Sequence, residues 1–170
     1  TETYDITTIR ASVPQYLLCK WIKENTDIKV LFSGEFADEL FCGYMYSKMA
    51  PSSIELEKDS KRLLEEIYLY DALRVDRTVG AFGLECRIPF ADKNLIDYVF
   101  SLPASLRMCK VNQEKKLLRD SFKEENVLPE EILYRKKQAF SDAVSSNEQC
   151  WYKSLQKEIN TLISNEELQF

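Results

Sequence analysis

Histidine does not occur anywhere in this 170-residue sequence. Without it, a Ser-His-Asp or Cys-His triad, a histidine general base and an imidazole metal site are all excluded. Cysteine occurs five times, an odd number with no Cys-x-x-Cys pair, so neither zinc-site spacing nor a disulfide framework is indicated. Free thiols in a reducing cytosol are the expected state. Glycine is scarce, so each is expected where the backbone requires it: Gly34, Gly43, Gly80 and Gly83.

Long apolar runs are also missing, since none approaches the roughly 18 residues that span a bilayer. Residues 1–5 contain neither an initiator methionine nor a basic segment followed by an apolar one, so they do not resemble a signal peptide. We therefore expect a cytoplasmic chain without membrane contact, and a fragment or processed piece of a longer protein. Lys and Arg total 23 against 28 Asp and Glu, and this net charge of −5 disfavours a surface wrapped by nucleic acid.

The sequence predicts six or so helices and one convincing strand, at residues 28–32. Capping boxes at Ser12–Gln15 and Ser52–Glu55 predict helices that run to about residues 25 and 73. Further helices are predicted at residues 37–44, after Asp92, over residues 113–125 and after Ser145. A buried strand needs ladder partners, so we expect further strands before the first residue, in a larger α/β domain.

The most distinctive segment is residues 30–41, in which the strand ends at Ser33 and Gly34 and an acidic first helical turn follows. Exposed backbone N–H groups at such a turn suit a phosphate. Glu35 and Asp38, three residues apart, suit a hard cation such as Mg²⁺, with the glutamate as a base. A simpler explanation is that these acids complement the helix dipole, and spacing alone leaves both explanations open.

Three other charged groups could carry chemistry. Arg10, near Thr7, could bind a carboxylate through two N–H groups. A lysine of the basic triplet at residues 135–137 could bind a phosphate, and Asp71 and Arg74 lie one helical turn apart. Each also has a structural explanation, namely a surface ion pair, a basic helix end and an ordinary intrahelical pair.

Four segments, in order, resemble the C-terminal synthetase domain of the glutamine-hydrolysing asparagine synthetase family. Residues 3–12, TYDITTIRAS, are similar to the family's TYDVTTIRAS, and residues 31–44, LFSGEFADELFCGY, resemble LSGEGADELFGGY. Residues 85–93, ECRIPFADK, resemble EARVPFLDK, and residues 135–142, RKKQAFSD, resemble RQKEQFSDG. The matches cover nearly the whole chain.

The resemblance implies that residues 1–170 form the C-terminal portion of an α/β domain. Its fold would be of the ATP-pyrophosphatase (adenine nucleotide alpha hydrolase-like) class, mostly helical with few parallel strands. The implied activity is that of a ligase that uses ATP and Mg²⁺, activates the side chain of aspartate as β-aspartyl-AMP, and forms asparagine with ammonia from a glutaminase domain. The implied partners are ATP, aspartate, that ammonia and the N-terminal part of the same enzyme, and a homodimer is left open.

The resemblance also implies roles for individual residues. Ser33 and Gly34 match positions that contact ATP, Asp38 matches a metal ligand, and Lys137 matches a catalytic residue that binds the phosphates. Glu35 matches the glutamate of the acyl-adenylate chemistry and could also deprotonate ammonium. Positions implicated in binding aspartate are matched by Thr7, Arg10, Asp71, Arg74 and Arg87.

Some features depart from the family pattern. Phe36 replaces the glycine after the glutamate, which would place a large ring beside the nucleotide loop, and Cys42 and Ala143 replace two other glycines. Neither the SGGxDSS pyrophosphate loop nor the N-terminal cysteine of the glutaminase domain occurs in these residues, so the chain alone is expected to be inactive. Two alternatives remain open: a degenerate, non-catalytic scaffold or partner module, and a related β-lactam synthetase or amide-forming cyclase.

Overall fold

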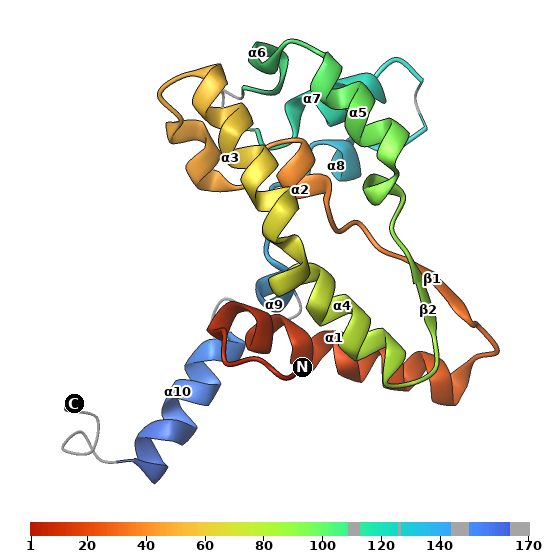
Figure 1. Ribbon diagram of the computed structural model, residues 1–170. Helices are drawn as coiled ribbons and strands as arrows, with labels where there is room; N and C mark the ends of the chain where they lie inside the picture. The colour runs from red at the N-terminus through yellow and green to blue at the C-terminus, as the bar shows by residue number, and fades with distance from the viewer. Residues whose placement is uncertain (109–112, 126, 144–149, 164–170) are drawn as a thin grey trace.

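The structure is a computed structural model that describes residues 1–108, 113–125, 127–143 and 150–163 (Figure 1). Its α-helices are α1 (Ile6–Asn25), α2 (Ala37–Leu40), α3 (Ser53–Glu66), α4 (Asp71–Gly80), α5 (Lys93–Ser101), α6 (Ala104–Arg107), α7 (Lys116–Ser121), α8 (Glu130–Leu133), α9 (Phe140–Ala143) and α10 (Trp151–Leu162). Short 3-10 helices are η1 (Met45–Met49), η2 (Ile67–Leu69) and η3 (Pro89–Ala91), and the strands are β1 (Val30–Phe32) and β2 (Glu85–Arg87). The chain is thus mostly helical with a small parallel sheet, as expected of an α/β fold.

The two strands pair in parallel, with Val30 opposite Glu85 and Phe32 opposite Arg87. The chain between them forms α2, α3 and α4, and such a helical crossover is the connection that parallel strands require (Figure 1). Strand β1 confirms the predicted strand in part. Strand β2 was not among the elements predicted by residue range, because its three residues, of which only Cys86 is half-buried, are too few to show a period.

Helix α1 begins well before Ser12, so the predicted cap at Ser12 was wrong. Asp5 is the N-cap, and its carboxylate accepts a hydrogen bond from the Thr8 N–H at 2.6 Å. Ser12 is buried within the helix, where its hydroxyl donates to the Thr8 carbonyl at 2.6 Å. The helix continues through Pro14 because its buried side packs against α4, and this packing outweighs the tendency of proline to end a helix.

The long helix predicted to start at Ser52 is two helices in the structure. Its start is confirmed, since the Ser52 hydroxyl accepts a hydrogen bond from the Glu55 N–H at 3.2 Å. Helix α3 ends at Glu66, and Tyr70, with φ −128° and ψ −95°, interrupts the helical path before α4 begins. The interruption starts a new helix at Asp71, and its first turns carry charged residues to the cleft described below.

The C-terminal half contains a shorter helix than predicted. Asp92 caps α5 as expected, because its carboxylate accepts hydrogen bonds from two N–H groups of the first turn, at 2.9 and 3.1 Å. The helix predicted over residues 113–125 is reduced to α7. The predicted cap at Ser145 lies outside the described residues, whereas α10 is present and extends away from the other helices (Figure 1).

Two apolar clusters hold the elements together, and burial of their surface is the main favourable contribution to the fold. The first joins α1, α4 and the sheet, and the second joins α2, α3, α5 and α7. Their most buried members are Cys19, Val75, Val79 and Leu84 in the first and Leu40, Phe41 and Val99 in the second. In the described part of the chain, no helix is long and apolar enough to span a membrane, and the cysteines are free thiols.

Arg107 links α6 to α3 through a buried charge. Its guanidinium donates to Glu57 Oε2 at 3.0 Å and to Ser60 Oγ at 3.3 Å, and its side chain is completely buried. The same carboxylate also accepts a hydrogen bond from Lys61 at 2.7 Å, but the Lys61 side chain is about half exposed. The two cations on Glu57 therefore differ mainly in their burial.

We expect Arg107→Met to lower the free energy of unfolding by about 2 kcal/mol or more, because Glu57 and Ser60 lose a buried partner. Lys61→Met is the matched control and should change the same quantity by less than about 0.5 kcal/mol, since exposed ion pairs contribute little. Urea denaturation of the two variants measures the difference. Equal losses would show that burial does not distinguish these two cations.

Candidate active site

A cleft of about 710 Å³ lies at the carboxyl end of β1, bordered by α1, the turn after β1, α4, residues 115–119 and residues 132–143. Seven cationic and four acidic side chains occur in its described lining: Arg10, Arg74, Lys115, Arg119, Arg135, Lys136 and Lys137 against Glu35, Asp38, Glu39 and Asp71. The formal charge of this lining is therefore +3, although the whole chain carries −5. Such a concentration of positive charge favours an anionic ligand.

Nine of the ten predicted site residues line this cleft and are thus brought together by the fold: Thr7, Arg10, Ser33, Gly34, Glu35, Asp38, Asp71, Arg74 and Lys137. Arg87 is the exception, because it does not belong to the described lining of the cleft. Its side chain is exposed and donates to Glu85 Oε1 at 2.7 Å. The carbonyl of Arg87 accepts the N–H of Ser33 at 2.9 Å, so this residue supports the turn after β1 through its backbone.

The turn after β1 requires an unusual backbone conformation. The Glu35 N–H donates to Ser33 Oγ at 3.4 Å, and Phe36 then adopts φ 71°, in the left-handed region that favours glycine. Cys42 adopts φ 56°. These are two of the positions at which the resembled motif has glycine, and the backbone gives a physical reason for it. Phe36 lies outside the described lining of the cleft.

Arg74 connects two carboxylates in the cleft. Its guanidinium lies 2.5 Å from Glu35 Oε1 and 2.8 Å from Asp71 Oδ1, which confirms the predicted Asp71–Arg74 pair and extends it to Glu35. Only 8% of the Arg74 side chain is exposed, so water screens these contacts little. Burial raises the pKa of Glu35, and the Arg74 charge opposes this rise. Glu35 therefore holds a proton more readily than a surface glutamate does, which suits acid–base chemistry.

Two lysines converge on the Asp38 carboxylate. Asp38 Oδ1 lies 2.9 Å from Lys115 Nζ and 3.5 Å from Lys137 Nζ. A Cβ atom at position 43 would lie 1.9 Å from the same oxygen, so only glycine leaves room for the carboxylate here. The close approach of the Asp38 carboxylate therefore requires glycine at position 43, as the scarcity of glycine in the sequence suggested.

Lys137 is also held by an aromatic ring. Its Nζ lies 4.7 Å from the centre of the Tyr44 ring, within the range of a cation–π contact. The Tyr44 hydroxyl donates to Glu39 Oε1, and Glu39 is buried. Burial raises the pKa values of both Tyr44 and Glu39, and the charge of Glu39 raises that of Tyr44 further. The hydroxyl therefore stays protonated and keeps the ring beside Lys137.

Among the lining residues that were not predicted as site residues are Glu39, Tyr44, Lys115 and Arg119. Glu39 and Tyr44 belong to the motif at residues 31–44, so the family resemblance could have indicated them. Lys115 and Arg119 come from a segment that reads as an ordinary charged helix. No local pattern shows that two of its cations line a cleft, because that depends on how the segment folds back onto α2.

Known proteins are similar to this chain over nearly its whole length. Residues 1–62 and 48–170 match a family model described as Asparagine synthase. A probable asparagine synthetase (glutamine-hydrolyzing) of Acanthamoeba polyphaga mimivirus is 53% identical over 169 residues, which are 99% of this chain and 30% of the relative. The asparagine synthetases (glutamine-hydrolyzing) of Cricetulus griseus and Homo sapiens are 51% and 53% identical over 97% and 92% of this chain, and 29% and 28% of their own lengths.

The chain therefore spans about 30% of the length of these curated relatives. The family match extends over both the N-terminal segment that contains Glu35 and Asp38 and the C-terminal segment that contains Lys137. Both sides of the cleft thus carry the family pattern, and this chain belongs to the asparagine synthase family.

Proposed function

We propose that this chain is part of an enzyme that makes asparagine from aspartate, with ATP as the energy source and ammonia supplied from glutamine. The names and the 51–53% identity of the relatives support this activity. The observation that carries the proposal is the cleft, whose described lining has a formal charge of +3 in a chain of −5 and so suits the phosphates of ATP. Aspartate-dependent ATP–pyrophosphate exchange by the full-length protein is the direct test, and its absence in folded protein would overturn the proposal.

The longer protein is proposed to supply the parts of the enzyme that these residues do not contain. A two-stranded parallel sheet is too small to be stable alone and needs cover on both faces. We infer that further strands extend the sheet into an ATP-pyrophosphatase fold, in which residues 1–170 form the C-terminal part of the synthetase domain. A pyrophosphate loop and a glutaminase domain would complete the machinery.

In the proposed reaction, the side-chain carboxylate of aspartate attacks the α-phosphate of ATP, and pyrophosphate leaves. Ammonia then attacks the acyl carbon of β-aspartyl-AMP, AMP leaves, and one proton is released. Glu35 is the proposed acceptor of that proton, because its raised pKa lets it hold a proton more readily than a surface glutamate does. Ser33 and Gly34 would contact the nucleotide, and Lys137 would neutralise charge on the phosphates.

The aspartate substrate carries a second carboxylate and an ammonium group. Arg10 is proposed to bind this carboxylate through two N–H groups, with the Thr7 hydroxyl nearby. Asp71 is proposed to accept from the ammonium group, and Arg74 holds Asp71 and Glu35 in place. Arg87 is left out of this group, because its side chain lies outside the described lining of the cleft.

Magnesium fits this cleft through Asp38. Sites for Mg²⁺ with nucleotides usually supply one or two carboxylates, and substrate phosphates complete the coordination. Asp38 lines the cleft with a quarter of its side chain exposed, and we propose it as the protein ligand. The bound ion would neutralise charge that develops on the phosphates.

Glu35→Gln should lower the turnover of the full-length enzyme at least ~10²-fold, because an amide cannot accept a proton. The wild-type rate should rise as the pH rises through the raised pKa of Glu35, where the carboxylate becomes ionised, and the variant should lose this dependence. Glu85→Gln is the matched control, since Glu85 is exposed and lies outside the described lining. Turnover measured against pH makes the comparison, and near-wild-type turnover would remove Glu35 from the catalytic group.

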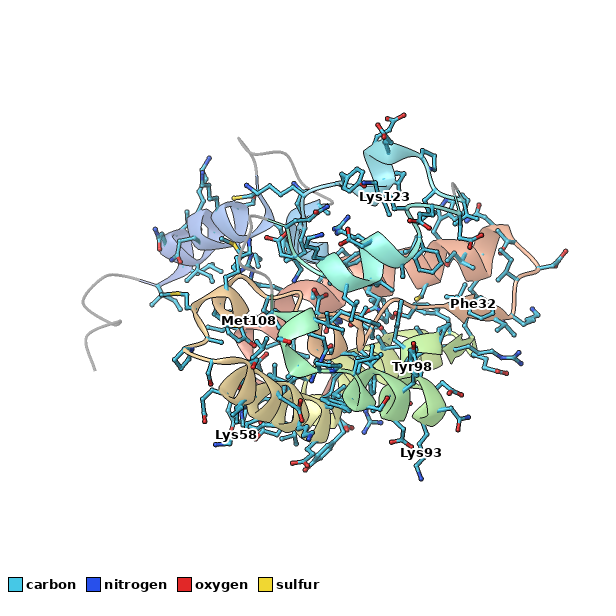
Figure 2. All side chains as sticks on the ribbon, turned by 90° about the horizontal axis from the view of Figure 1, so that it is seen from above. Phe32, Lys58, Lys93, Tyr98, Met108 and Lys123 are labelled. Atoms are coloured by element: carbon cyan, nitrogen blue, oxygen red, sulfur yellow. The ribbon has the colours of Figure 1, made fainter. Side chains whose placement is uncertain are left out.

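Lys137→Ala should weaken the binding of ATP about tenfold, because a partly buried cation at the phosphates is lost. Lys123→Ala is the control, since Lys123 is an exposed lysine shortly after α7 and outside the described lining (Figure 2). Calorimetric titration with ATP measures both affinities. If the affinity and turnover of the Lys137 variant are unchanged, its contacts with Asp38 and Tyr44 are structural.

Phe36→Gly should leave the affinity for ATP within about twofold of wild type, because the ring lies outside the described lining of the cleft. The same titration measures this. A degenerate scaffold in which Phe36 blocks the nucleotide predicts the opposite, namely that ATP binding appears or strengthens when the ring is removed. That result would favour the non-catalytic alternative over the enzyme.

A further inference from the structure

We propose that Arg119 is a positioning residue, which sets the place of Lys137 in the cleft by holding the backbone that carries this lysine. The inference rests on the proposed function and adds to it a residue outside the four segments of the family resemblance. Arg119 lies in α7 and borders the cleft, well before Lys137 in the chain.

The segment that carries Lys137 has little regular structure of its own. Residues 134–139 connect α8 to α9, and none of these described residues belongs to a helix or a strand. Lys137 is half-buried, whereas its neighbours in the segment are exposed, so packing of side chains alone does not fix the path of the backbone. A lysine side chain is long and flexible, and the place of its ammonium group therefore depends on what holds the backbone.

Arg119 holds this backbone through its guanidinium group. Its Nε donates to the carbonyl of Glu114 at 2.8 Å, just before α7. Its terminal nitrogens donate to the carbonyl of Leu133 and, at 2.9 Å, to the carbonyl of Arg135. A planar guanidinium presents its N–H groups in fixed directions, so three carbonyls bound at once have fixed positions relative to one another. The residues just before Lys137 are thereby joined to the start of α7.

Glu114 extends this connection to Lys137 itself. Its side chain is buried and accepts a hydrogen bond from Lys48 Nζ at 2.7 Å. This bond lowers the pKa of Glu114, burial opposes the change, and a hydrogen bond from the backbone N–H of Lys137 lowers the pKa further. Glu114 therefore binds Arg119 through its carbonyl and the Lys137 backbone through its carboxylate.

The ammonium group of Lys137 has two contacts of its own in the cleft. Its Nζ lies 3.5 Å from Asp38 Oδ1 and 4.7 Å from the centre of the Tyr44 ring. The first distance is longer than a usual charge-assisted hydrogen bond, so neither contact alone fixes a flexible side chain. The place of the ammonium group is therefore set jointly by these contacts and by the backbone that Arg119 holds.

Arg119 is itself a cation in the lining, so a direct contact with a phosphate is the competing explanation. The hydrogen bonds decide between the two. Each of the three guanidinium nitrogens already donates to a carbonyl, which leaves fewer N–H groups for a ligand. Arg119 thus acts on the nucleotide through Lys137, and its effect on ATP binding requires that lysine.

The test is a double-mutant cycle on the full-length protein, with the dissociation constant for ATP measured by calorimetric titration. Arg119→Met should weaken ATP binding about fivefold, because Lys137 is no longer held at the phosphates. In the Lys137→Ala background, the same substitution should change the affinity less than about twofold, because the group through which Arg119 acts is gone. Arg77→Met is the matched control, since Arg77 is an exposed arginine of α4 outside the described lining; its affinity should equal that of wild type.

Two further measurements separate positioning from charge and from folding. Arg119→Lys keeps the charge, but one ammonium group cannot bind three carbonyls as a planar fork does, so this variant should lose as much ATP affinity as Arg119→Met. Hydrogen–deuterium exchange of the unliganded protein should be faster at residues 133–137 in both variants and unchanged in the first apolar cluster.

The outcomes distinguish a positioning residue from the alternatives. Losses that multiply in the double variant, or full ATP affinity in Arg119→Lys, would overturn the inference, because Arg119 would then act through its own charge. Unchanged exchange at residues 133–137, or faster exchange throughout the protein, would overturn it as well. If the wild type does not bind ATP, both proposals fail. If the cycle shows the coupling but the wild type makes no asparagine, the proposed function fails while the role of Arg119 stands.

Discussion

The contact of Asp38 with two lysines is the interaction on which the cleft depends. It joins the turn after β1 to residues that follow much later in the chain, and so closes one side of the site. A partly buried carboxylate costs less free energy when cations lie beside it, and here two of them do. The same contact therefore shapes the cleft and brings two of its cations together.

That arrangement is possible only because of the backbone between Gly34 and Gly43. Two residues in this stretch, Phe36 and Cys42, adopt the left-handed conformation, and Gly43 leaves room for a carboxylate oxygen. The conformation is retained although two of the family glycines are replaced here. Leu40 and Phe41, which lie between these two residues in the chain, are buried in the second apolar cluster, and this packing fixes the path of the backbone here.

Local signals in the sequence were sufficient where the interaction is itself local. The strand before Ser33, the caps at Ser52 and Asp92, and the Asp71–Arg74 pair all depend on residues a few positions apart, and all were found in the structure. The cap at Ser12 failed because packing of α1 against α4 overrides a good capping sequence.

The remaining features could not be read locally, because they arise between distant segments. Strand β2 is recognisable only when it pairs with β1, and the inward position of Lys115 only when its segment meets Asp38. The carbonyls that Arg119 binds likewise lie well beyond α7. Of the four acidic side chains in the described lining, all but Glu39 were predicted as site residues, whereas of the seven cations only Arg10, Arg74 and Lys137 were.

Because the chain contains no histidine, any proton transfer by its side chains in the cleft falls to other residues. Near neutral pH, proton transfer commonly relies on imidazole, whose ordinary pKa lies in that range. Here burial moves the pKa of Glu35 upwards, towards that range, and Arg74 limits the shift so that the carboxylate can still ionise. In the proposed function, the lysines of the cleft would supply positive charge for the phosphates of ATP. A glutamate that is partly desolvated and held by one arginine can thus do the proton-transfer work for which the chain has no histidine.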